Sequence, residues 1–203
     1  MTEKGPILVV EDIPDTLELV NVTLTFKGYD VITATNGKEA LEIIQKDHPA
    51  LIVTDILMPQ MDGFSLVHRL RIDPDTRGIP VIFLSATYVA PEDKEFAAAI
   101  GVTRFLEKPI VIEDFLRTVA ELISRGTLAD SRPLDARKFF EGYRERLEVK
   151  LRQKVSQIAR TESMLATLLE EEKKSFKISL QAAIEERDEI QTLLDQITKQ
   201  TDK

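Results

Sequence analysis

A carboxylate stands at the end of the apolar run 51–54, where a buried strand would stop. This residue, Asp55, is followed by a loop that contains Pro59 and Gly63. Alone, such a carboxylate could cap a loop, bind a metal ion or act as a nucleophile. Other apolar runs end in comparable polar residues: Glu11-Asp12, Ser85-Ala86 and Lys108-Pro109.

These polar residues would meet in one cleft if the runs are parallel strands, because ligands bind at the carboxyl ends of such strands. Glu11, Asp12 and Asp55 would repel one another without a cation, and oxygen ligands with open positions suit Mg²⁺. Lys108 would offer a positive charge to a phosphoryl oxygen, and Ser85 could donate a hydrogen bond to another. A carboxylate nucleophile beside a divalent ion and a lysine is suited to forming an aspartyl phosphate.

The elements that would position these residues alternate through residues 1–124. Runs such as "ILVV" and "VIFL" are apolar throughout, which is typical of parallel strands covered on both faces. Leu17, Val20 and Leu24 show helical spacing in a segment between two runs. The alternation predicts a doubly wound α/β domain. The expected strands are 7–10, 31–34, 51–54, 81–84 and 104–106, and the expected helices are 15–27, 37–47, 64–71, 92–100 and 112–124.

Four stretches of this first half resemble the receiver domain of bacterial two-component response regulators. "ILVVEDIPD", "LIVTDILMPQMDGF", "IPVIFLSA" and "FLEKP" match the motifs of that family in order and spacing. The resemblance implies a flavodoxin-like, five-stranded parallel sheet with strand order 2-1-3-4-5. It also implies a domain that takes a phosphoryl group from a sensor histidine kinase and catalyses its own phosphorylation and dephosphorylation. No separate output enzyme is visible in the sequence.

The resemblance further assigns a role to each site residue. Asp55 would accept the phosphoryl group from a phosphohistidine. Glu11 and Asp12 would help Asp55 to hold Mg²⁺, and the backbone carbonyl of Leu57 would complete the protein ligands. Lys108 would pair with the phosphoryl group.

A second group of residues would report the modification. Ser85 and Phe105 would form the hydroxyl and aromatic switch pair, and the Lys108-Pro109 peptide bond would be cis, a state found almost only before proline. Simpler interpretations remain, since Ser85 could merely cap the next loop and Phe105 could be an ordinary core aromatic. His48 and His68 are expected to be surface residues.

The overall composition limits the classes of partner and location. The 35 acidic residues exceed the 27 basic ones, for a net charge of -8, which argues against nonspecific binding to nucleic acid or to an anionic membrane. The absence of Cys excludes disulfides and thiolate metal sites, and two His disfavour a zinc site. The N-terminus lacks the apolar stretch of a signal peptide, and no run approaches the roughly 20 apolar residues of a membrane span. We therefore expect a soluble cytoplasmic protein.

The second half of the chain has a different composition. Residues 125–135 would be a linker, and 136–203 a helical extension that begins with Asp135 as N-cap. No Gly or Pro follows Gly142, which favours one unbroken helix. A heptad-like apolar seam comprises Leu151, Val155, Ile158, Leu165, Leu169, Phe176, Leu180, Ala183, Ile190, Leu194 and Ile197.

Three interpretations of this extension stay open: a coiled coil or bundle with another chain, a helix packed on its own receiver domain, or a hairpin that bends near residues 170–175. We predict a homodimer through residues 137–200, in which the seam residues Glu162 and Arg187 could define the register. Residues 137–160 hold 8 basic and 3 acidic residues, and residues 161–203 hold 6 and 10. This segregation of charge favours antiparallel neighbours, although each exposed pair contributes little.

The predicted output is an interaction with a downstream protein whose identity the sequence does not reveal. An alternative is a DNA-binding transcriptional regulator that uses the basic segment 137–160. No recognisable DNA-binding motif accompanies that segment, so binding to nucleic acid is not expected.

Overall fold

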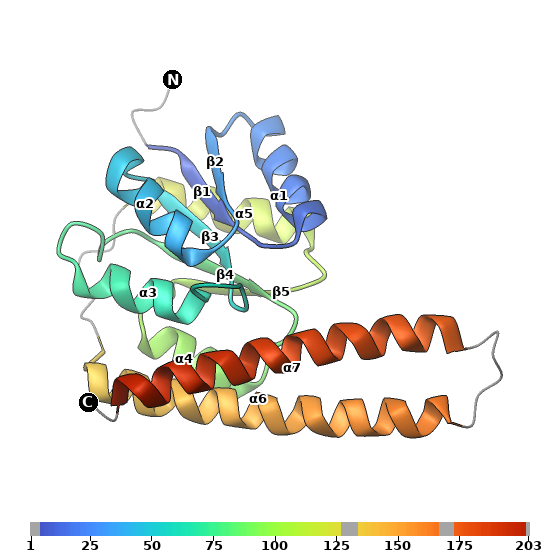
Figure 1. Cartoon of the computed structure of the whole chain (residues 1–203). Helices are drawn as coiled ribbons and strands as arrows, with labels where there is room; N and C mark the ends of the chain where they lie inside the picture. The colour runs from blue at the N-terminus through green and yellow to red at the C-terminus, as the bar shows by residue number, and fades with distance from the viewer. Residues whose placement is uncertain (1–4, 127–133, 167–172, 202–203) are drawn as a thin grey trace. The chain divides into compact units, whose positions relative to one another are not determined.

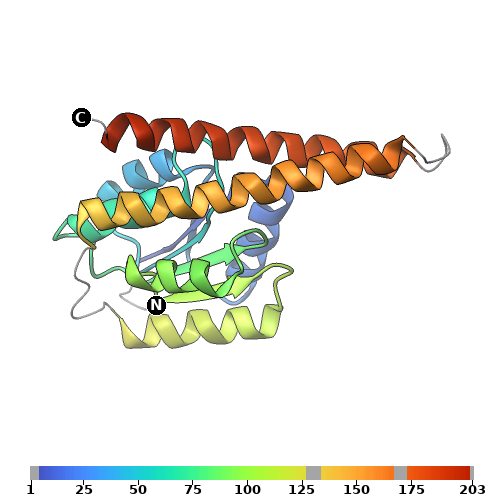
Figure 2. The same ribbon diagram turned by 90° about the horizontal axis from the view of Figure 1, so that it is seen from below.

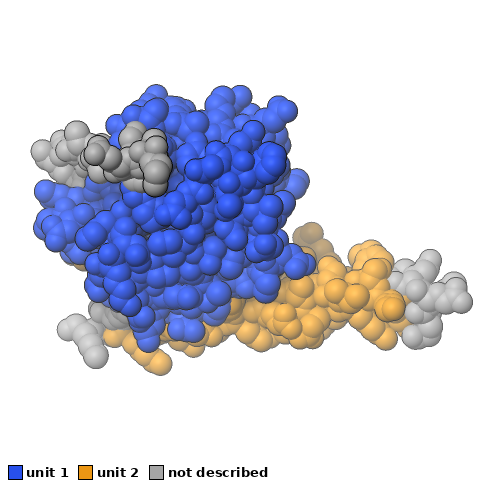
Figure 3. All heavy atoms as spheres, turned by 90° about the horizontal axis from the view of Figure 1, so that it is seen from above, with its two compact units in different colours: residues 1–135 blue, residues 136–203 orange. Residues whose placement is uncertain are grey.

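A computed structural model describes residues 5–126, 134–166 and 173–201. The chain divides into two compact units, residues 1–135 and 136–203, which Figure 3 colours separately. Unit 1 contains the α/β elements and unit 2 the helices that follow them. The predicted linker 125–135 falls largely on residues 127–133, which lie outside the described residues.

Unit 1 is built on one parallel sheet, whose strand order is β2-β1-β3-β4-β5 (Figure 1). The chain leaves β1 for the edge strand β2 on one side, and then crosses to β3 on the other side of β1. That reversal creates a crevice at the carboxyl ends of β1 and β3, which is the usual ligand position in such sheets. The strands are β1 Ile7–Val10, β2 Val31–Ala34, β3 Leu51–Asp55, β4 Val81–Ser85 and β5 Arg104–Glu107.

Helices cover both faces of this sheet (Figures 1 and 2). On one face lie α1 Pro14–Phe26 and α5 Ile112–Arg125, and on the other lie α2 Gly37–Asp47, α3 Gly63–Ile72 and α4 Pro91–Ala99. The first face holds a buried core that joins strand residues to residues of α1 and α5. Its members are Ile7, Val9, Val20, Leu24, Leu51, Val53, Ile82, Leu84, Phe115, Val119 and Leu122. The predicted flavodoxin-like fold is confirmed, including the continuous apolar strands.

Local signals explain where the helices begin. The Asn36 side chain accepts hydrogen bonds from the backbone N–H groups of Lys38 and Glu39, both at 3.0 Å. This is the cap that a helix needs for its unpaired N-terminal donors. Pro14 and Pro91 occupy the first turns of α1 and α4, a position where a missing N–H costs nothing. Predicted and observed bounds differ by at most one residue at either end, which is within the usual uncertainty at element ends.

In its described residues, unit 2 has two helices, α6 Ala136–Leu165 and α7 Lys173–Thr201. They lie side by side and run in opposite directions (Figures 1 and 2). The favoured expectation of one unbroken helix is therefore wrong, and the hairpin interpretation is correct. The bend expected near 170–175 falls mainly on 167–172, outside the described residues. Among the described helices, none is long and apolar enough to cross a membrane.

Packing explains why two helices replace one. Lys154 of α6 forms an ion pair with Glu186 of α7, which shows that the basic first part of the extension faces the acidic second part. Ile158 and Ala183 lie one turn from this pair at helical spacing, and both are buried. A hairpin lets each helix cover part of the apolar face of the other, whereas one long helix would expose its whole seam.

Candidate functional site

Four strand ends bring the predicted site residues of unit 1 to one edge of the sheet. Asp55 is the last residue of β3 and Ser85 the last of β4. Glu11 follows β1 directly, and Lys108 follows β5. In the sheet register Asp55 pairs with Leu84, so the two strand ends lie at the same level.

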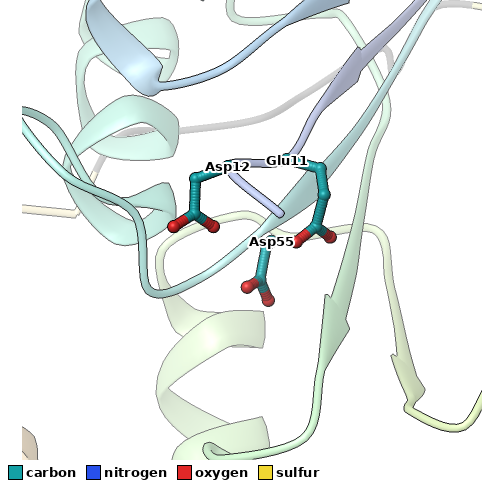
Figure 4. Close-up of side chains that lie close together, drawn as sticks. All are labelled: Glu11, Asp12 and Asp55. Carbon is teal, nitrogen blue, oxygen red and sulfur yellow. The ribbon is translucent and has the colours of Figure 1, made fainter. Parts of the chain in front are cut away.

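Three carboxylates gather at this edge, as Figure 4 shows. One oxygen from each of Glu11, Asp12 and Asp55 lies within 4.8 Å of the others. Glu11 is almost fully buried and Asp55 nearly so, while Asp12 is half-buried. The site is therefore enclosed by protein on the side of the sheet and open beside Asp12.

Lys108 supplies the positive charge of the cluster. Its Nζ donates a hydrogen bond to Glu11 Oε2 at 2.7 Å, and it lies 3.4 Å from Asp55 Oδ2. The lysine side chain is only 17% exposed, so these ion pairs are screened less than surface pairs. The ammonium is close enough to touch a group attached to Asp55.

Burial is the main influence on how these carboxylates titrate. It raises the pKa of Asp55 from 3.8 to about 7; the Lys108 charge opposes the rise and the Glu11 charge adds to it. Burial likewise raises the pKa of Glu11 against the opposing effect of Lys108, and raises the pKa of Asp12. Because desolvation penalises the charged forms, a cation among the three carboxylates would be stabilising.

The donor set fits a hard divalent cation. All three side chains offer oxygen, the donor that Mg²⁺ prefers, and the open side would admit the water ligands that this ion retains. Glu11 and Asp55 could not both stay charged here without positive charge nearby. Lys108 supplies one positive charge, and both carboxylates share it. Leu57, the predicted carbonyl ligand, lies half-buried in the loop after β3.

The predicted switch residues lie on β4 and β5. The Ser85 hydroxyl is buried and accepts hydrogen bonds from the backbone N–H groups of Thr87 and Tyr88, both at 3.2 Å. Phe105 is half-buried, with its ring centroid 6.4 Å from that of Phe83. The simpler interpretation of Ser85 as a loop cap describes its present contacts, so its hydroxyl links the site to the loop before α4.

The segment from Phe105 to Pro109 has a lysine beside its aromatic ring and a cis peptide bond at its end. Lys94 Nζ lies 5.7 Å from the centroid of the Phe105 ring, and it forms an ion pair with Glu107. The peptide bond between Lys108 and Pro109 is cis, as the resemblance implies. A hollow of about 420 Å³ adjoins this segment, lined by Phe105, Leu106, Glu107, Lys108, Pro109, Ile110, Val111, Asp114 and Phe115.

Sequence reasoning missed the structural role of Asp62 and Gly63. Asp62 caps α3 by accepting hydrogen bonds from the backbone N–H and hydroxyl of Ser65, at 3.0 and 2.7 Å. The N–H of Gly63 donates to the carbonyl of Ile56 at 2.7 Å. A Cβ atom on Gly63 would lie 2.4 Å from the backbone oxygen of Asp55. The "DG" pair signals a turn, but only the structure shows that this turn closes on Asp55.

The expectation for His68 was wrong. The residue lies in α3 and is 7% exposed, and burial lowers its pKa. A single histidine in a short helix gives no signal of which face it occupies, since α3 is buried along most of its length. His48, in contrast, is exposed as expected and ends α2 with a positive φ of 46°.

Comparison with known proteins identifies the family. Residues 7–120 match the model of the response regulator receiver domain, and the chain belongs to this family. It is 40% identical over 115 residues to an uncharacterized 14.6 kDa protein of Leptolyngbya boryana, covering 57% of this chain and 87% of that protein. It is 35% identical over 119 residues to the DNA-binding dual master transcriptional regulator RpaA of Synechocystis, covering 59% of this chain and 49% of RpaA. The chain thus spans about half the length of that regulator.

Solved structures give the same result for the fold. A receiver domain of a histidine kinase from Syntrophus aciditrophicus is 35% identical with a TM-score of 0.57, and the match covers 64% of this chain and 98% of that one. The chemotaxis response regulator CheY4 of Vibrio cholerae is 34% identical with a TM-score of 0.55, covering 59% and 98%. The receiver domain of the sensor histidine kinase PA1611 from Pseudomonas aeruginosa is 26% identical with a TM-score of 0.55, and the match covers 60% of this chain and 98% of that one. That structure has a magnesium ion coordinated in its active site cleft.

Proposed function

We propose that this chain is a phosphoacceptor of two-component signalling, in which Asp55 takes a phosphoryl group from the phosphohistidine of a sensor histidine kinase. The observation that carries the proposal is the convergence of three carboxylates and one ammonium at the carboxyl ends of neighbouring strands. Such a cluster has no structural benefit, because burial destabilises each charged carboxylate. The cluster does suit the formation of an acyl phosphate, because the negative charge of the carboxylate and of the phosphoryl oxygens must be neutralised there.

The transfer follows from this geometry. A carboxylate oxygen of Asp55 attacks the phosphorus of the phosphohistidine, and the P–N bond breaks. The bonding electrons return to the imidazole nitrogen, which takes up a proton. Bound Mg²⁺ would neutralise the phosphoryl oxygens, held by Asp12, Asp55 and the Leu57 carbonyl, with Glu11 assisting. Lys108 would hold another phosphoryl oxygen, because its ammonium already lies 3.4 Å from Asp55.

Ser85 and Phe105 would carry the signal away from the site. The Ser85 hydroxyl is buried at the end of β4, one strand from Asp55. Donation of its proton to a phosphoryl oxygen would displace the hydroxyl relative to its present partners, Thr87 and Tyr88. A rearranged loop before α4 would change the surroundings of Phe105, which α4 contacts through Lys94. A local charge change would thus bias a nearby packing arrangement.

The output would be protein–protein interaction through the α6–α7 hairpin, either as a homodimer or with a downstream protein. Two long helices with charged outer faces and no recognisable catalytic motif suit an interaction module. The predicted homodimer through residues 137–200 stays a prediction, although the hairpin already supplies the antiparallel neighbour that the charge pattern favours. The predicted cytoplasmic location also remains a prediction.

The alternative is a DNA-binding regulator, since RpaA is a DNA-binding transcriptional regulator. The likeness to RpaA covers only the receiver part of this chain. Within 137–160, three basic side chains pair with carboxylates, which reduces the charge available to phosphates. These pairs are Arg137–Glu141, Arg146–Glu145 and Lys154–Glu186. Interaction with protein is the better supported output.

Uptake of phosphate from a small phosphodonor tests the proposed function. The full chain is incubated with the donor and Mg²⁺, and the intact mass is measured. We expect the mass to rise by one phosphoryl group in the wild type. Equal uptake by Asp55→Asn would overturn the assignment of Asp55, and equal uptake in excess chelator would overturn the role of Mg²⁺.

A further inference from the structure

The α6–α7 hairpin has a side that its own helix contact does not cover. Lys154 and Glu186 mark the line along which the helices meet. Each further residue along an α-helix is rotated by about 100°, so Val155 points to one side of this line. Val155 belongs to the apolar seam and yet is 50% exposed in the structure of the whole chain.

Other apolar residues lie on the same side as Val155. Leu151 precedes it by one turn on α6 and is half-buried. In an antiparallel pair, residues that follow the contact position in sequence lie on the same side of both helices. Leu180 and Ile184 of α7 precede Glu186 by six and two residues, and the turn of the helix brings them round to that same side, at about 120° and 160° from Glu186. Both are half-buried. Leu151, Val155, Leu180 and Ile184 are called the open face below.

The two helices also differ in charge when each is counted along its whole length beside the other. Residues 149–160 of α6 include Lys150, Arg152, Lys154 and Arg160 and no acidic residue. Residues 181–195 of α7 include only Arg187 as a basic residue, against five acidic ones: Glu185, Glu186, Asp188, Glu189 and Asp195. One hairpin therefore offers both a basic helix and an acidic helix along the same length.

We propose that the open face is covered by a second copy of this chain, with α6 of each copy packed against α7 of the other. This arrangement is isologous, since the same surface serves both copies. It places the basic segment of one copy against the acidic segment of its partner, whereas α6 against α6 would bring like charges together. All neighbouring helices are then antiparallel, as in an up-and-down four-helix bundle. The four apolar residues of each open face form the shared core.

This inference specifies the surface of the proposed homodimer, and it rests on self-association rather than on the phosphoacceptor role of Asp55. The chain contains no cysteine, so single cysteines can map the contact in the full-length protein. Val155→Cys and Ile184→Cys proteins are oxidised separately and as an equal mixture. Gln157→Cys, on an exposed part of α6 about 200° from Val155, is the matched control.

The proposed arrangement predicts that the mixture forms a Val155–Ile184 crosslink faster than Val155→Cys crosslinks alone, and that Gln157→Cys with Ile184→Cys crosslinks least. Faster crosslinking of Val155→Cys with itself would show α6 against α6 and overturn the arrangement. Equal crosslinking by the Gln157 control would overturn the open face as the contact.

A second measurement tests the same surface without disulfide crosslinking. Val155→Glu and Gln157→Glu each add one negative charge to exposed positions of α6, and solution mass is measured over a range of concentration. We expect Val155→Glu to weaken dimerisation by at least about 10-fold, because a buried unpaired charge is costly, and Gln157→Glu to leave it nearly unchanged. Equal effects of the two variants, or a monomeric wild type, would overturn the proposal. Phosphate uptake by the same variants reports separately on Asp55.

Discussion

Lys108 donates a hydrogen bond to Glu11 at 2.7 Å, a shorter distance than the 3.4 Å that separates it from Asp55. Without a cation, the lysine therefore neutralises a carboxylate that belongs to the proposed metal site. A divalent ion entering among Glu11, Asp12 and Asp55 competes with this ammonium for negative charge. In the proposed mechanism, Lys108 would become free to hold a phosphoryl oxygen once the ion takes over part of its role.

Replacing Lys108 by alanine should separate metal binding from the response to phosphate. We expect Lys108→Ala to bind Mg²⁺ as tightly as the wild type or more tightly, because removal of the ammonium eases entry of the cation. We expect slower phosphate uptake by this variant, and a smaller rearrangement of Ser85 and Phe105 after uptake. Calorimetric titration measures the first quantity, and Lys94→Ala, a lysine outside the carboxylate cluster, is the control. Much weaker Mg²⁺ binding in Lys108→Ala would contradict the role given to this residue.

Asp55 should make the stability of the metal-free protein depend on pH. Its pKa is about 7 in the fold against an ordinary value of 3.8. Because the folded pKa is raised, the stability that Asp55 contributes is complete below pH 3.8 and is lost as the pH rises towards 7. Asp55→Asn should therefore be more stable than the wild type at pH 7–8, by about 1–3 kcal/mol.

Urea unfolding in chelator at several pH values measures this difference. The two proteins should differ least at the lowest pH, below about 4, and added Mg²⁺ should reduce the difference at pH 7–8 by stabilising the wild type alone. If the wild type were the more stable of the two at pH 8 without metal, the charged form of Asp55 would not be destabilised by its burial in the fold.

Gly63 should be needed for the geometry of Asp55. In Gly63→Ala the new Cβ would lie 2.4 Å from the Asp55 carbonyl oxygen and 3.0 Å from Ile56 Cα, so the end of β3 must shift. We expect a loss of about 1–3 kcal/mol together with slower phosphate uptake. Gly28→Ala is the control, since Gly28 has a φ of +84° and no atom within 4 Å of its Cβ position. That variant should lose stability by about 1–2 kcal/mol and keep the wild-type uptake.

Phe105 should report phosphorylation of Asp55 if it belongs to the switch. The chain contains no tryptophan, so Phe105→Trp introduces a single tryptophan, which can be excited apart from the tyrosines, at this half-buried position. We expect its emission to change when a phosphoryl mimic binds with Mg²⁺, and not when Asp55 is also replaced by Asn. Lys94→Met in the same background should alter the starting emission, because Lys94 Nζ lies 5.7 Å from the ring centroid. Constant emission with mimic bound would make Phe105 an ordinary core aromatic.

Much of unit 1 was predictable, because its local signals agree with one another. Runs that are apolar over most of their length, such as Leu51–Asp55 and Val81–Ser85, indicate buried parallel strands, and parallel strands bring their carboxyl ends together. The convergence of Glu11, Asp55 and Lys108 follows from that topology. The strand order came from the family resemblance, since hydrophobic pattern alone does not order strands.

Other features depended on contacts that a sequence does not display. The Gly63 turn closes on the Asp55 backbone, and His68 is buried on a helix most of whose residues are buried, polar ones included. In the extension, absence of Gly and Pro is compatible with one helix or with two. The Lys154–Glu186 pair and the burial of Ile158 and Ala183 show that tertiary packing favoured two.

Locating the phosphoryl group tests the central claim most directly. The full chain is treated with a small phosphodonor in Mg²⁺, and peptides are mapped by mass spectrometry after trapping of the acyl phosphate. The account predicts one modified position, Asp55, with no modification in Asp55→Asn or in chelator. Modification at a different residue, or at Asp55 to the same extent without Mg²⁺, would contradict a metal-assisted phosphoacceptor at the end of β3.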